Sequence, residues 1–470
     1  MFRKPLRIFF SGIGGSGMSA IASFMADKGH VIAGSDRAFD RNNGHSVYQL
    51  LRSKGITIVP QDGNGLNGSF DFAVFSTAVE PDRPEAIKAK ELGIATKTRP
   101  EYLAEIVKEF KTIAISGTSG KSTTSGMISF AMERLGLQPN FIGGGRVKQF
   151  RTATNLGNAI TGDSDYLVIE ACESDGTIVD YKPLHSAILN LHLDHHSIDE
   201  TAEMFETLIR NTKGMVVLNA DDQNLTRLTA KGAITFSIEN PSDYRATSVV
   251  YHSFSSDFTI LGTRCCLSMP GKYNLYNALA CIATLCAMGV SLEKLAGVLS
   301  EFRGIERRFD ILLDDGKRLV IDDYAHNPHK ISSLMEGIKN TRDRVCYIFQ
   351  PHGFTPTRLM KKEYIEAFTR NLRDGDHLVL LPILYAGGTA RKDISSHDLA
   401  EGIRAGRRSV EVVDGREKIL ERADEWDTFV VFGARDETLS DFAHDIVRVI
   451  QGTCSTADRG ADAQSNPCVR

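Results

Sequence analysis

Two glycine-rich loops constrain the fold of this 470-residue chain more than any other feature. Each loop follows a short apolar run, at residues 6–10 and 112–116, and each precedes a stretch with helical periodicity. A second apolar run at 31–34 follows the first of these helices. A strand, a glycine loop, a helix and a further strand form a βαβ unit, in which the two strands are parallel. The sequence therefore predicts an α/β fold with parallel sheets.

The first loop has the spacing of a diphosphate-binding turn. Gly12, Gly14 and Gly17 form a GxGxxG pattern, and Asp36 follows the next predicted strand. Backbone N–H groups at a helix N-terminus bind a diphosphate, and an acid after the next strand often binds a ribose. On the residues alone, the pattern fits a NAD-binding oxidoreductase, and it also fits a glycine turn that serves only close packing.

The second loop is a shortened phosphate-binding loop. It consists of Gly117, Thr118, Ser119, Gly120, Lys121, Ser122 and Thr123. Ile115 stands where the longer GxxxxGK[ST] motif has a glycine. A lysine in this position neutralises the transferred phosphate, and the hydroxyl after it holds Mg²⁺. We therefore predict that this loop binds the phosphates of ATP, with Ser122 as a metal ligand.

Acidic residues follow another apolar run. Glu170 ends the run at 166–170, and Glu173 and Asp175 lie just beyond it. An ATP-binding domain is expected to place a second Mg²⁺ ligand at the end of such a strand. Glu170 and Glu173 both fit this role, and the choice between them stays open. Asp175 also fits a helix cap.

Further apolar runs divide the chain into three blocks. Strands are also predicted at 72–76, 187–190 and 215–219, and then at 318–321, 345–349, 377–381 and 429–432. We predict a Rossmann-like N-terminal domain at 1–108, a central P-loop ATP-binding domain at 109–308 and a Rossmann-like C-terminal domain at 309–452. Residues 453–470 are polar and aperiodic, which predicts a disordered tail.

Composition excludes several classes of function. The chain has 55 Lys and Arg against 59 Asp and Glu, a net charge of −4, so bulk charge attracts it neither to nucleic acid nor to acidic membranes. The longest apolar stretch, 278–290, is shorter than the roughly 20 residues that a membrane span needs. The eight cysteines include no CxxC pair, which argues against a zinc ribbon. We expect a cytoplasmic protein, and the oligomeric state stays open.

Several further segments join these loops in a recognisable order. They are 12–18, 76–78, 117–123, 170–175, 194–195, 271–278, 307–309, 322–328 and 349–352. Together they resemble the Mur ligase family, and within it the branch that adds L-alanine to UDP-N-acetylmuramate. The resemblance covers nearly the whole chain except the tail, and nine motifs in order are far more specific than one.

The resemblance implies an activity and its substrates. It implies one domain for a UDP-linked sugar, one for ATP with Mg²⁺ and one for an amino acid. The first glycine loop then holds the diphosphate of the UDP-sugar rather than NAD. The implied reaction is amide formation in peptidoglycan precursor synthesis. The carboxylate of UDP-N-acetylmuramate attacks the γ-phosphate of ATP, and the amine then displaces phosphate from the acyl phosphate.

Roles for individual residues also follow from the resemblance. The implied catalytic residues are Lys121, His195, Glu170 and Glu173, and the implied metal ligands are Ser122, Glu170, Glu173 and His195. Besides the P-loop, the implied ATP-binding residues are Asn274, Asn277, Arg308 and Asp323. The implied substrate-binding residues are Gly14, Gly15, Ser16, Gly17, Met18, Asp36, Ser76, Thr77, Tyr324, His326, His352 and Arg358. Asn274 also fits a helix cap, and Arg307 is interpreted as a surface charge or an ion-pair partner.

The chain departs from the pattern on the amino-acid side. The alanine-adding branch carries arginines directly after the Gln-Pro-His segment and three residues later, where this chain has Gly353 and Pro356. Arg358 is a candidate substitute for binding the acceptor's carboxylate. The acceptor therefore need not be L-alanine.

Three other interpretations stay open. A recycling ligase would add a preformed peptide to the same UDP-sugar. A degenerate ligase would serve only as a nucleotide-binding partner. A NAD-binding oxidoreductase would leave Lys121 and Glu170 without a role.

Overall fold

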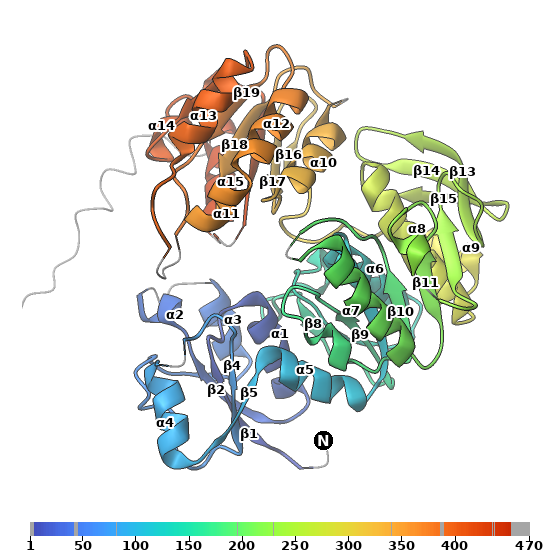
Figure 1. Ribbon diagram of the computed structural model, residues 1–470, viewed down its shortest axis with the longest axis vertical. Coiled ribbons are helices and arrows are strands. Elements are labelled where there is room, and N and C mark those ends of the chain that lie inside the picture. The colour runs from blue at the N-terminus through green and yellow to red at the C-terminus, as the bar shows by residue number, and fades with distance from the viewer. Residues whose placement is uncertain are drawn as a thin grey trace, which may run out of the picture. The chain divides into compact units, whose positions relative to one another are not determined.

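The computed structural model describes residues 4–41, 46–80, 82–194, 196–228, 230–339, 341–385, 390–434, 436 and 438–452. The chain is an α/β protein with three sheets, as the sequence predicts (Figure 1). It forms two compact units, Met1–Ile305 and Glu306–Arg470. The first unit contains two of the sheets and the second unit contains the third. His195 and the predicted tail lie outside the described residues, and the three domain limits stay predictions.

The first sheet is parallel and has the order β3-β2-β1-β4-β5. Its strands are β1 (Arg7–Ser11), β2 (Val31–Ser35), β3 (Thr57–Ile58), β4 (Phe72–Phe75) and β5 (Ala95–Thr98). Its helices are α1 (Ser16–Asp27), α2 (Arg37–Arg41), α3 (Ser46–Ser53), α4 (Pro84–Leu92) and α5 (Arg99–Lys108). The buried rings of Phe10 and Phe72 pack edge-to-face on Tyr102 of α5, so this helix is fixed against the sheet by aromatic contacts.

The second sheet has ten strands in the order β15-β14-β13-β12-β11-β10-β6-β9-β7-β8. These are β6 (Lys111–Ser116), β7 (Asn140–Ile142), β8 (Ala159–Ile160), β9 (Tyr166–Glu170), β10 (His185–Ile188), β11 (Val216–Asn219), β12 (Ile234–Ser237), β13 (Tyr244–Tyr251), β14 (Ser256–Ile260) and β15 (Thr263–Leu267). The helices are α6 (Lys121–Arg134), α7 (Ile198–Asn211), α8 (Lys272–Ala287) and α9 (Leu292–Leu299), with short 3-10 turns η1 (Lys148–Phe150), η2 (Thr177–Asp180) and η3 (Leu225–Arg227).

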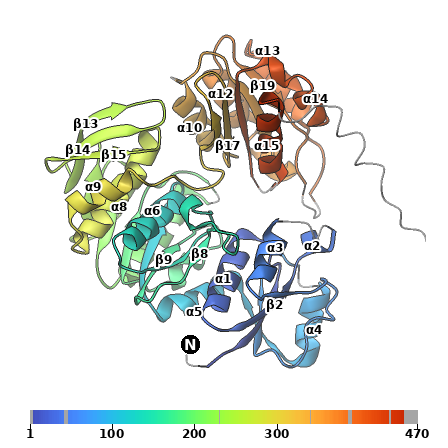
Figure 2. The same cartoon turned by 180° about the vertical axis from the view of Figure 1, so that it is seen from behind.

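The longest apolar stretch of the sequence forms a core helix. Helix α8 is buried along most of its length and packs against α6, and α9 packs against β15, the last strand of the antiparallel group β13 to β15 (Figure 2). Among the described residues, no helix combines the length and the apolar character that a membrane crossing requires.

The third sheet has the order β16-β17-β21-β18-β19-β20 and is parallel except at β16. Its strands are β16 (Asp310–Asp314), β17 (Leu319–Asp323), β18 (Cys346–Gln350), β19 (His377–Leu380), β20 (Val410–Val412) and β21 (Thr428–Gly433). The helices are α10 (Pro328–Ile338), α11 (Phe354–Leu359), α12 (Lys361–Asn371), α13 (Ser396–Ala405), α14 (Glu417–Leu420) and α15 (Thr438–Ile450), with the turn η4 (Ala423–Glu425).

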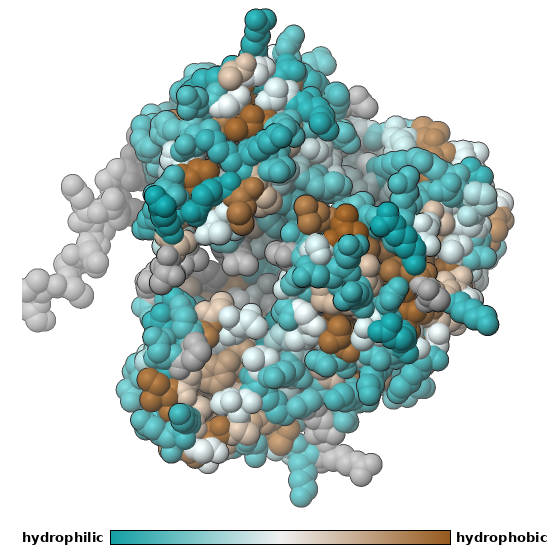
Figure 3. Space-filling view, viewed as in Figure 1, coloured by the Kyte–Doolittle hydropathy of each residue, from teal (hydrophilic) through white to brown (hydrophobic). Residues whose placement is uncertain are grey.

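Apolar side chains lie in small groups on one face of the molecule (Figure 3). The face drawn in Figure 3 is mostly hydrophilic, with scattered apolar residues between charged ones. Most large apolar side chains are instead buried in the cores around the three sheets. The fold therefore leaves the loops at the carboxyl ends of the parallel strands as the natural place for a ligand site.

Candidate active site

The second glycine loop links β6 to α6 through two left-handed glycines. Gly117 has a φ of +133° and Gly120 a φ of +86°, conformations that L side chains rarely adopt. Gly120 caps the N-terminus of α6, and a Cβ at Gly120 would collide with the amide oxygen of Asn277 in α8. The first N–H groups of α6 have no acceptor within the helix, so the loop presents donors where a phosphate would bind.

The substitution Gly120→Ala is expected to raise the KM for ATP at least about tenfold. Its Cβ would both strain the backbone, by about 1–2 kcal/mol, and push Asn277 away from the loop. Gly136→Ala is the matched control, because Gly136 has a φ of +75° with open space around its Cβ position. Steady-state kinetics and thermal unfolding of both variants measure the two effects. A KM for ATP that rises equally in both variants would contradict the steric explanation.

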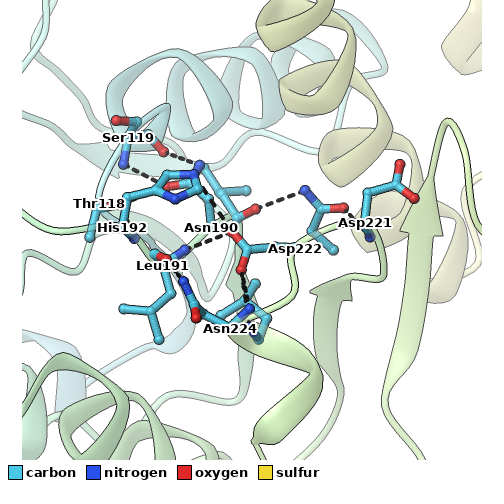
Figure 4. Close-up of polar contacts among 11 residues, drawn as sticks. Thr118, Ser119, Asn190, Leu191, His192, Asp221, Asp222 and Asn224 are labelled. Carbon is cyan, nitrogen blue, oxygen red and sulfur yellow. Dashed lines mark hydrogen bonds and ion pairs between the residues drawn. The ribbon is translucent and has the colours of Figure 1, made fainter. Parts of the chain in front are cut away.

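Asn190, which the sequence analysis did not select, holds the loop from the end of β10. Its Oδ1 accepts hydrogen bonds from Thr118 Oγ1 at 2.9 Å and from the Ser119 N–H at 2.8 Å, and its Nδ2 donates to the Ser119 carbonyl at 3.0 Å (Figure 4). The Thr118 N–H donates to the Asn190 carbonyl. Thr118 and Ser119 are therefore hydrogen-bonded to Asn190, and the candidate phosphate donors of the loop are those at the start of α6.

A second layer of contacts fixes Asn190 in turn. Asp222, just after β11, accepts hydrogen bonds from the Leu191 N–H at 2.9 Å and the Asn224 N–H at 3.0 Å, and lies 3.7 Å from His192 Nε2 (Figure 4). Asn224 Nδ2 donates to the Leu191 carbonyl at 2.8 Å. The loops after β10 and β11 thus support the phosphate-binding loop together. Polar residues directly after neighbouring parallel strands are the sequence signal that would have found them.

Lys121 and Ser122 each meet one of the two predicted acids. Lys121 Nζ lies 2.8 Å from Glu173 Oε2, and Ser122 Oγ donates to Glu170 Oε2 at 2.9 Å. The other oxygen of Glu170 accepts from the Gly144 N–H at 2.7 Å, which fixes the carboxylate. The structure therefore gives the two acids different partners.

Lys121 is a buried cation. Its side chain is 13 % exposed and that of Glu173 is 2 % exposed. Burial acts to lower the pKa of Lys121, but Cys172, Glu173 and Glu170 outweigh it and raise that pKa above its ordinary value. The ammonium therefore remains charged at neutral pH, as binding a phosphate requires.

The two asparagines predicted near the nucleotide lie together beside the loop. Asn277 Oδ1 accepts from Thr124 Oγ1 at 3.2 Å, and Asn277 Nδ2 donates to Asn274 Oδ1 at 3.4 Å. Asn274 Nδ2 donates to the Pro270 carbonyl at 2.8 Å. Both side chains are buried in α8. Asn277 therefore joins α8 to α6, and Asn274 supports it. Gly271 is the N-cap residue of α8, so the alternative interpretation of Asn274 as the helix cap is wrong.

The first glycine loop is closed by residues that directly follow β2 and β4. The Gly14 N–H donates to Asp36 Oδ2 at 2.9 Å, so Asp36 holds the loop itself. Gly12 has a φ of +82°, and a Cβ there would lie 2.8 Å from the Cβ of Ser76. Gly14, Gly15, Ser16, Gly17, Met18, Asp36 and Ser76 therefore gather around the N-terminus of α1, whereas Thr77 is exposed beyond the end of β4.

Asn158, which directly precedes β8, binds the start of α1 and was also missed by the sequence motifs. Its Nδ2 donates to the Ser16 carbonyl at 2.9 Å and to Ser19 Oγ at 3.1 Å. Asn158 follows no recognisable motif, and its role depends on contacts far apart in the sequence. The start of α1 is thus anchored by the domain that carries the phosphate loop.

The second unit has its own cluster of predicted residues. Asp323, at the end of β17, accepts hydrogen bonds from the Phe309 and Ala325 N–H groups, both at 2.6 Å. The guanidinium of Arg308 lies 4.9 Å from the ring centre of Tyr324, and the ring of His326 lies 5.5 Å from that of Tyr324. Arg308, Asp323, Tyr324 and His326 are therefore neighbours, as the motif order predicts.

The position of Arg307 decides between its two interpretations, a surface charge and an ion-pair partner. Its side chain is 9 % exposed, so its interpretation as a surface charge is wrong, and the ion-pair alternative is confirmed by Asp322 at 3.5 Å. Its two terminal nitrogens donate to the Gly433 and Asp436 carbonyls at 2.8 and 2.9 Å. Burial raises the pKa of Asp322 to about 7 despite this partner.

Gly353 and Pro356, which replace the two arginines expected after the Gln-Pro-His segment, lie close together. Gly353 has a φ of +74°, which a glycine adopts freely, and a Cβ there would lie 3.1 Å from Pro356 Cδ. His352 forms a bridge with Leu384. Arg358, the candidate carboxylate-binding residue, pairs with Asp393 at 3.0 Å. The glycine and the proline form one local structure at the start of α11.

Comparison with known proteins gives the family. Three family models match in order, described as the Mur ligase family catalytic domain at 7–111, the Mur ligase middle domain at 115–285 and the Mur ligase glutamate ligase domain at 307–435. A UDP-N-acetylmuramate–L-alanine ligase of Caldicellulosiruptor saccharolyticus is 32% identical over 454 residues, covering 92% of this chain and 96% of that protein. The chain belongs to the Mur ligase family.

Other Mur ligases extend the comparison. A protein of the same name from Syntrophotalea carbinolica is 33% identical over 426 residues, which cover 87% of this chain and 90% of that protein. The crystal structure of UDP-N-acetylmuramate-alanine ligase from Thermotoga maritima matches with a TM-score of 0.81 and 25% identity, covering 96% of this chain and 100% of that one. A murein peptide ligase from Psychrobacter arcticus, at 22% identity and a TM-score of 0.68, shares the fold.

Proposed function

We propose that this Mur ligase joins the carboxylate of UDP-N-acetylmuramate to the amine of an amino acid, with ATP as the energy source, in peptidoglycan precursor synthesis. One observation carries the proposal. The phosphate loop brings its lysine to 2.8 Å from Glu173 and its serine hydroxyl to 2.9 Å from Glu170. Relatives named UDP-N-acetylmuramate–L-alanine ligase, 32–33% identical over most of their length, support this substrate.

The residues at the loop fit ATP and Mg²⁺. Mg²⁺ takes hard oxygen ligands, and the Ser122 hydroxyl beside the Glu170 carboxylate provides such a donor set. When bound, the ion neutralises phosphate charge. We assign it to Ser122 and Glu170, because Glu173 is already paired with Lys121. His195 remains a predicted catalytic residue and metal ligand.

Lys121 supplies the positive charge that the two reacting anions need. The carboxylate of the UDP-sugar and the γ-phosphate of ATP are both anions, so their approach needs a cation between them. The Lys121 ammonium is largely buried and charged, and Lys121 is the first residue of α6, whose free N–H groups are further donors for a phosphate. Attack of the carboxylate on the γ-phosphate forms an acyl phosphate and releases ADP. The amine then attacks the acyl carbon, which forms the amide and releases phosphate.

The second unit supplies the amino-acid side of this proposal. Tyr324, His326, His352 and Arg358 are its predicted acceptor residues, and Arg308 and Asp323 its predicted ATP contacts. Arg358 would have to exchange Asp393 for the acceptor's carboxylate. The names of the relatives make L-alanine the first acceptor to test. Because Gly353 and Pro356 occupy the two positions where the alanine-adding branch has arginines, a preformed peptide is the second. A cytoplasmic location fits a reaction that consumes ATP.

Phosphate release tests the proposed function. Mg-ATP and UDP-N-acetylmuramate are combined with a panel of L- and D-amino acids and with peptides that begin with L-alanine. We expect one panel member to stimulate release, with a matching amide product detected by mass spectrometry. Stimulation by a peptide alone would identify a recycling ligase. ATP binding without stimulated turnover would support a nucleotide-binding partner instead.

A further inference from the structure

Arg99 lies against the first glycine loop although no motif marks it. It is the first residue of α5, whose start is fixed by a capping box between Thr98 and Glu101. A Cβ on Gly17 would lie 3.1 Å from Arg99 Cδ, 3.5 Å from its Nε and 3.6 Å from its Nη1. The guanidinium therefore lies beside the second residue of α1, in the loop predicted to hold a diphosphate.

Arg99 also reaches the acidic segment next to the phosphate loop. Its Nη2 lies 2.6 Å from Asp175 Oδ2, and the two side chains are 24 % and 17 % exposed. The other oxygen of Asp175 accepts hydrogen bonds from Thr177 N and Oγ1 at 3.2 and 2.6 Å, so the carboxylate is held in place. Asp175 lies two residues beyond Glu173, the partner of Lys121. Arg99 thus contacts both the first glycine loop and the acidic segment whose Glu173 pairs with Lys121.

The charges around Arg99 favour an anionic ligand. The N-terminus of a helix carries partial positive charge, so a guanidinium in the first turn of α5 and beside the first turn of α1 is repelled by both. Asp175 provides one compensating charge. The ion pair engages Nη2, whereas Nε and Nη1 are the nitrogens nearest Gly17. A guanidinium matches the paired oxygens of a diphosphate through such neighbouring N–H groups.

Another cation near the loop is less well placed. Arg37 lies 3.4 Å from Glu80, which also pairs with Arg83 at 2.8 Å, and its side chain is 42 % exposed. Arg99 is both more buried and in direct reach of the loop backbone.

We propose that Arg99 binds the diphosphate of the UDP-sugar beside Gly17, and that Asp175 orients its guanidinium for this contact. The inference rests on the proposed function, since it takes the UDP-sugar as the ligand of this loop. It adds a substrate-binding residue that lies outside the motifs of the family resemblance.

Calorimetric titration of purified variants with UDP, with UDP-N-acetylmuramate and separately with Mg-ATP tests the inference. Arg99→Met is expected to weaken binding of both uridine ligands by at least about 30-fold, with the affinity for Mg-ATP within threefold of wild type. Asp175→Asn removes the ion pair but keeps the arginine, and is expected to weaken UDP binding by only about three- to tenfold, because the guanidinium is less well oriented but still present. Lys88→Met, which breaks an exposed ion pair on α4, is the control for loss of positive charge.

The outcomes separate substrate binding from a structural role. Equal losses in Arg99→Met and Asp175→Asn would show that only the ion pair matters, and would overturn the inference. If Arg99→Met unfolds, Arg99→Lys replaces it, with an expected loss of about tenfold because the fork is lost and the charge is kept; an unchanged affinity would also overturn the inference. A wild-type protein that binds no uridine ligand would contradict the proposed function itself.

Discussion

The substitution Lys121→Met is expected to lower kcat for phosphate release by at least about 10³-fold. Lys121 is the buried cation of the phosphate loop, and without it the attacking carboxylate and the γ-phosphate repel each other across a site of low dielectric constant. Methionine keeps an unbranched apolar side chain that is one heavy atom shorter and uncharged. Initial rates at saturating ATP and UDP-N-acetylmuramate measure the effect.

The same substitution also strains the fold, so it needs a matched partner variant. Lys121→Met leaves Glu173, whose side chain is 2 % exposed, buried without a counter-ion, which costs about 3–5 kcal/mol of folding free energy. The double variant Lys121→Met, Glu173→Gln removes both charges, and its free energy of unfolding is expected to return to within about 1 kcal/mol of wild type. We expect this stable double variant to remain inactive. Activity within tenfold of wild type would exclude Lys121 from the reaction.

The parallel framework was predictable because its signals are local. A short apolar run followed by a glycine loop and a helical pattern is written within about 25 residues, and β1, β2 and β6 appear within one residue of the predicted bounds at each end. The loop glycines were also identified from local motifs. Glycine is required at Gly12, Gly117 and Gly120 because these residues adopt positive φ values that few other residues tolerate.

The antiparallel part of the second sheet left no such signal. Strand β13 has only one fully buried residue in eight, Ala246, so its sequence shows no apolar run. Its position depends on pairing with β14 through a register shift between Thr247 and Val250. Pairing of this kind is decided by neighbouring strands and turns, which a pattern along one strand does not record.

Supporting residues of the site were missed for a related reason. Asn190 and Asp222 act because β10 lies between β6 and β11, which brings the ends of these strands together. In the sequence the two residues are separated by a helix and a strand, and each alone resembles an ordinary turn residue. The departures at Gly353 and Pro356 were visible, but their mutual packing needed the positive φ of Gly353.

The sequence leaves open whether Glu170 or Glu173 is the metal ligand, and in the structure the two carboxylates have different partners. Glu170 Oε2 accepts a hydrogen bond from the Ser122 hydroxyl, and Glu170 Oε1 accepts one from the Gly144 N–H. Oε2 therefore faces Ser122, which is the other predicted Mg²⁺ ligand. Glu173 is instead committed to Lys121. Glu170→Gln is therefore expected to raise the Mg²⁺ concentration for half-maximal activity by about 10²-fold, because a neutral amide is a poorer ligand for a hard cation.

Glu173→Gln is expected to act differently on the same assay. It leaves the Ser122–Glu170 pair intact, so the Mg²⁺ requirement should stay within threefold of wild type while kcat falls, because Lys121 loses the partner that orients it. Glu203→Gln, an exposed acid on α7, is the control. Titration of activity with Mg²⁺ at fixed ATP separates the two acids. A shifted Mg²⁺ requirement in Glu173→Gln with none in Glu170→Gln would assign the metal to Glu173, and would mean that Lys121 exchanges partners when ATP binds.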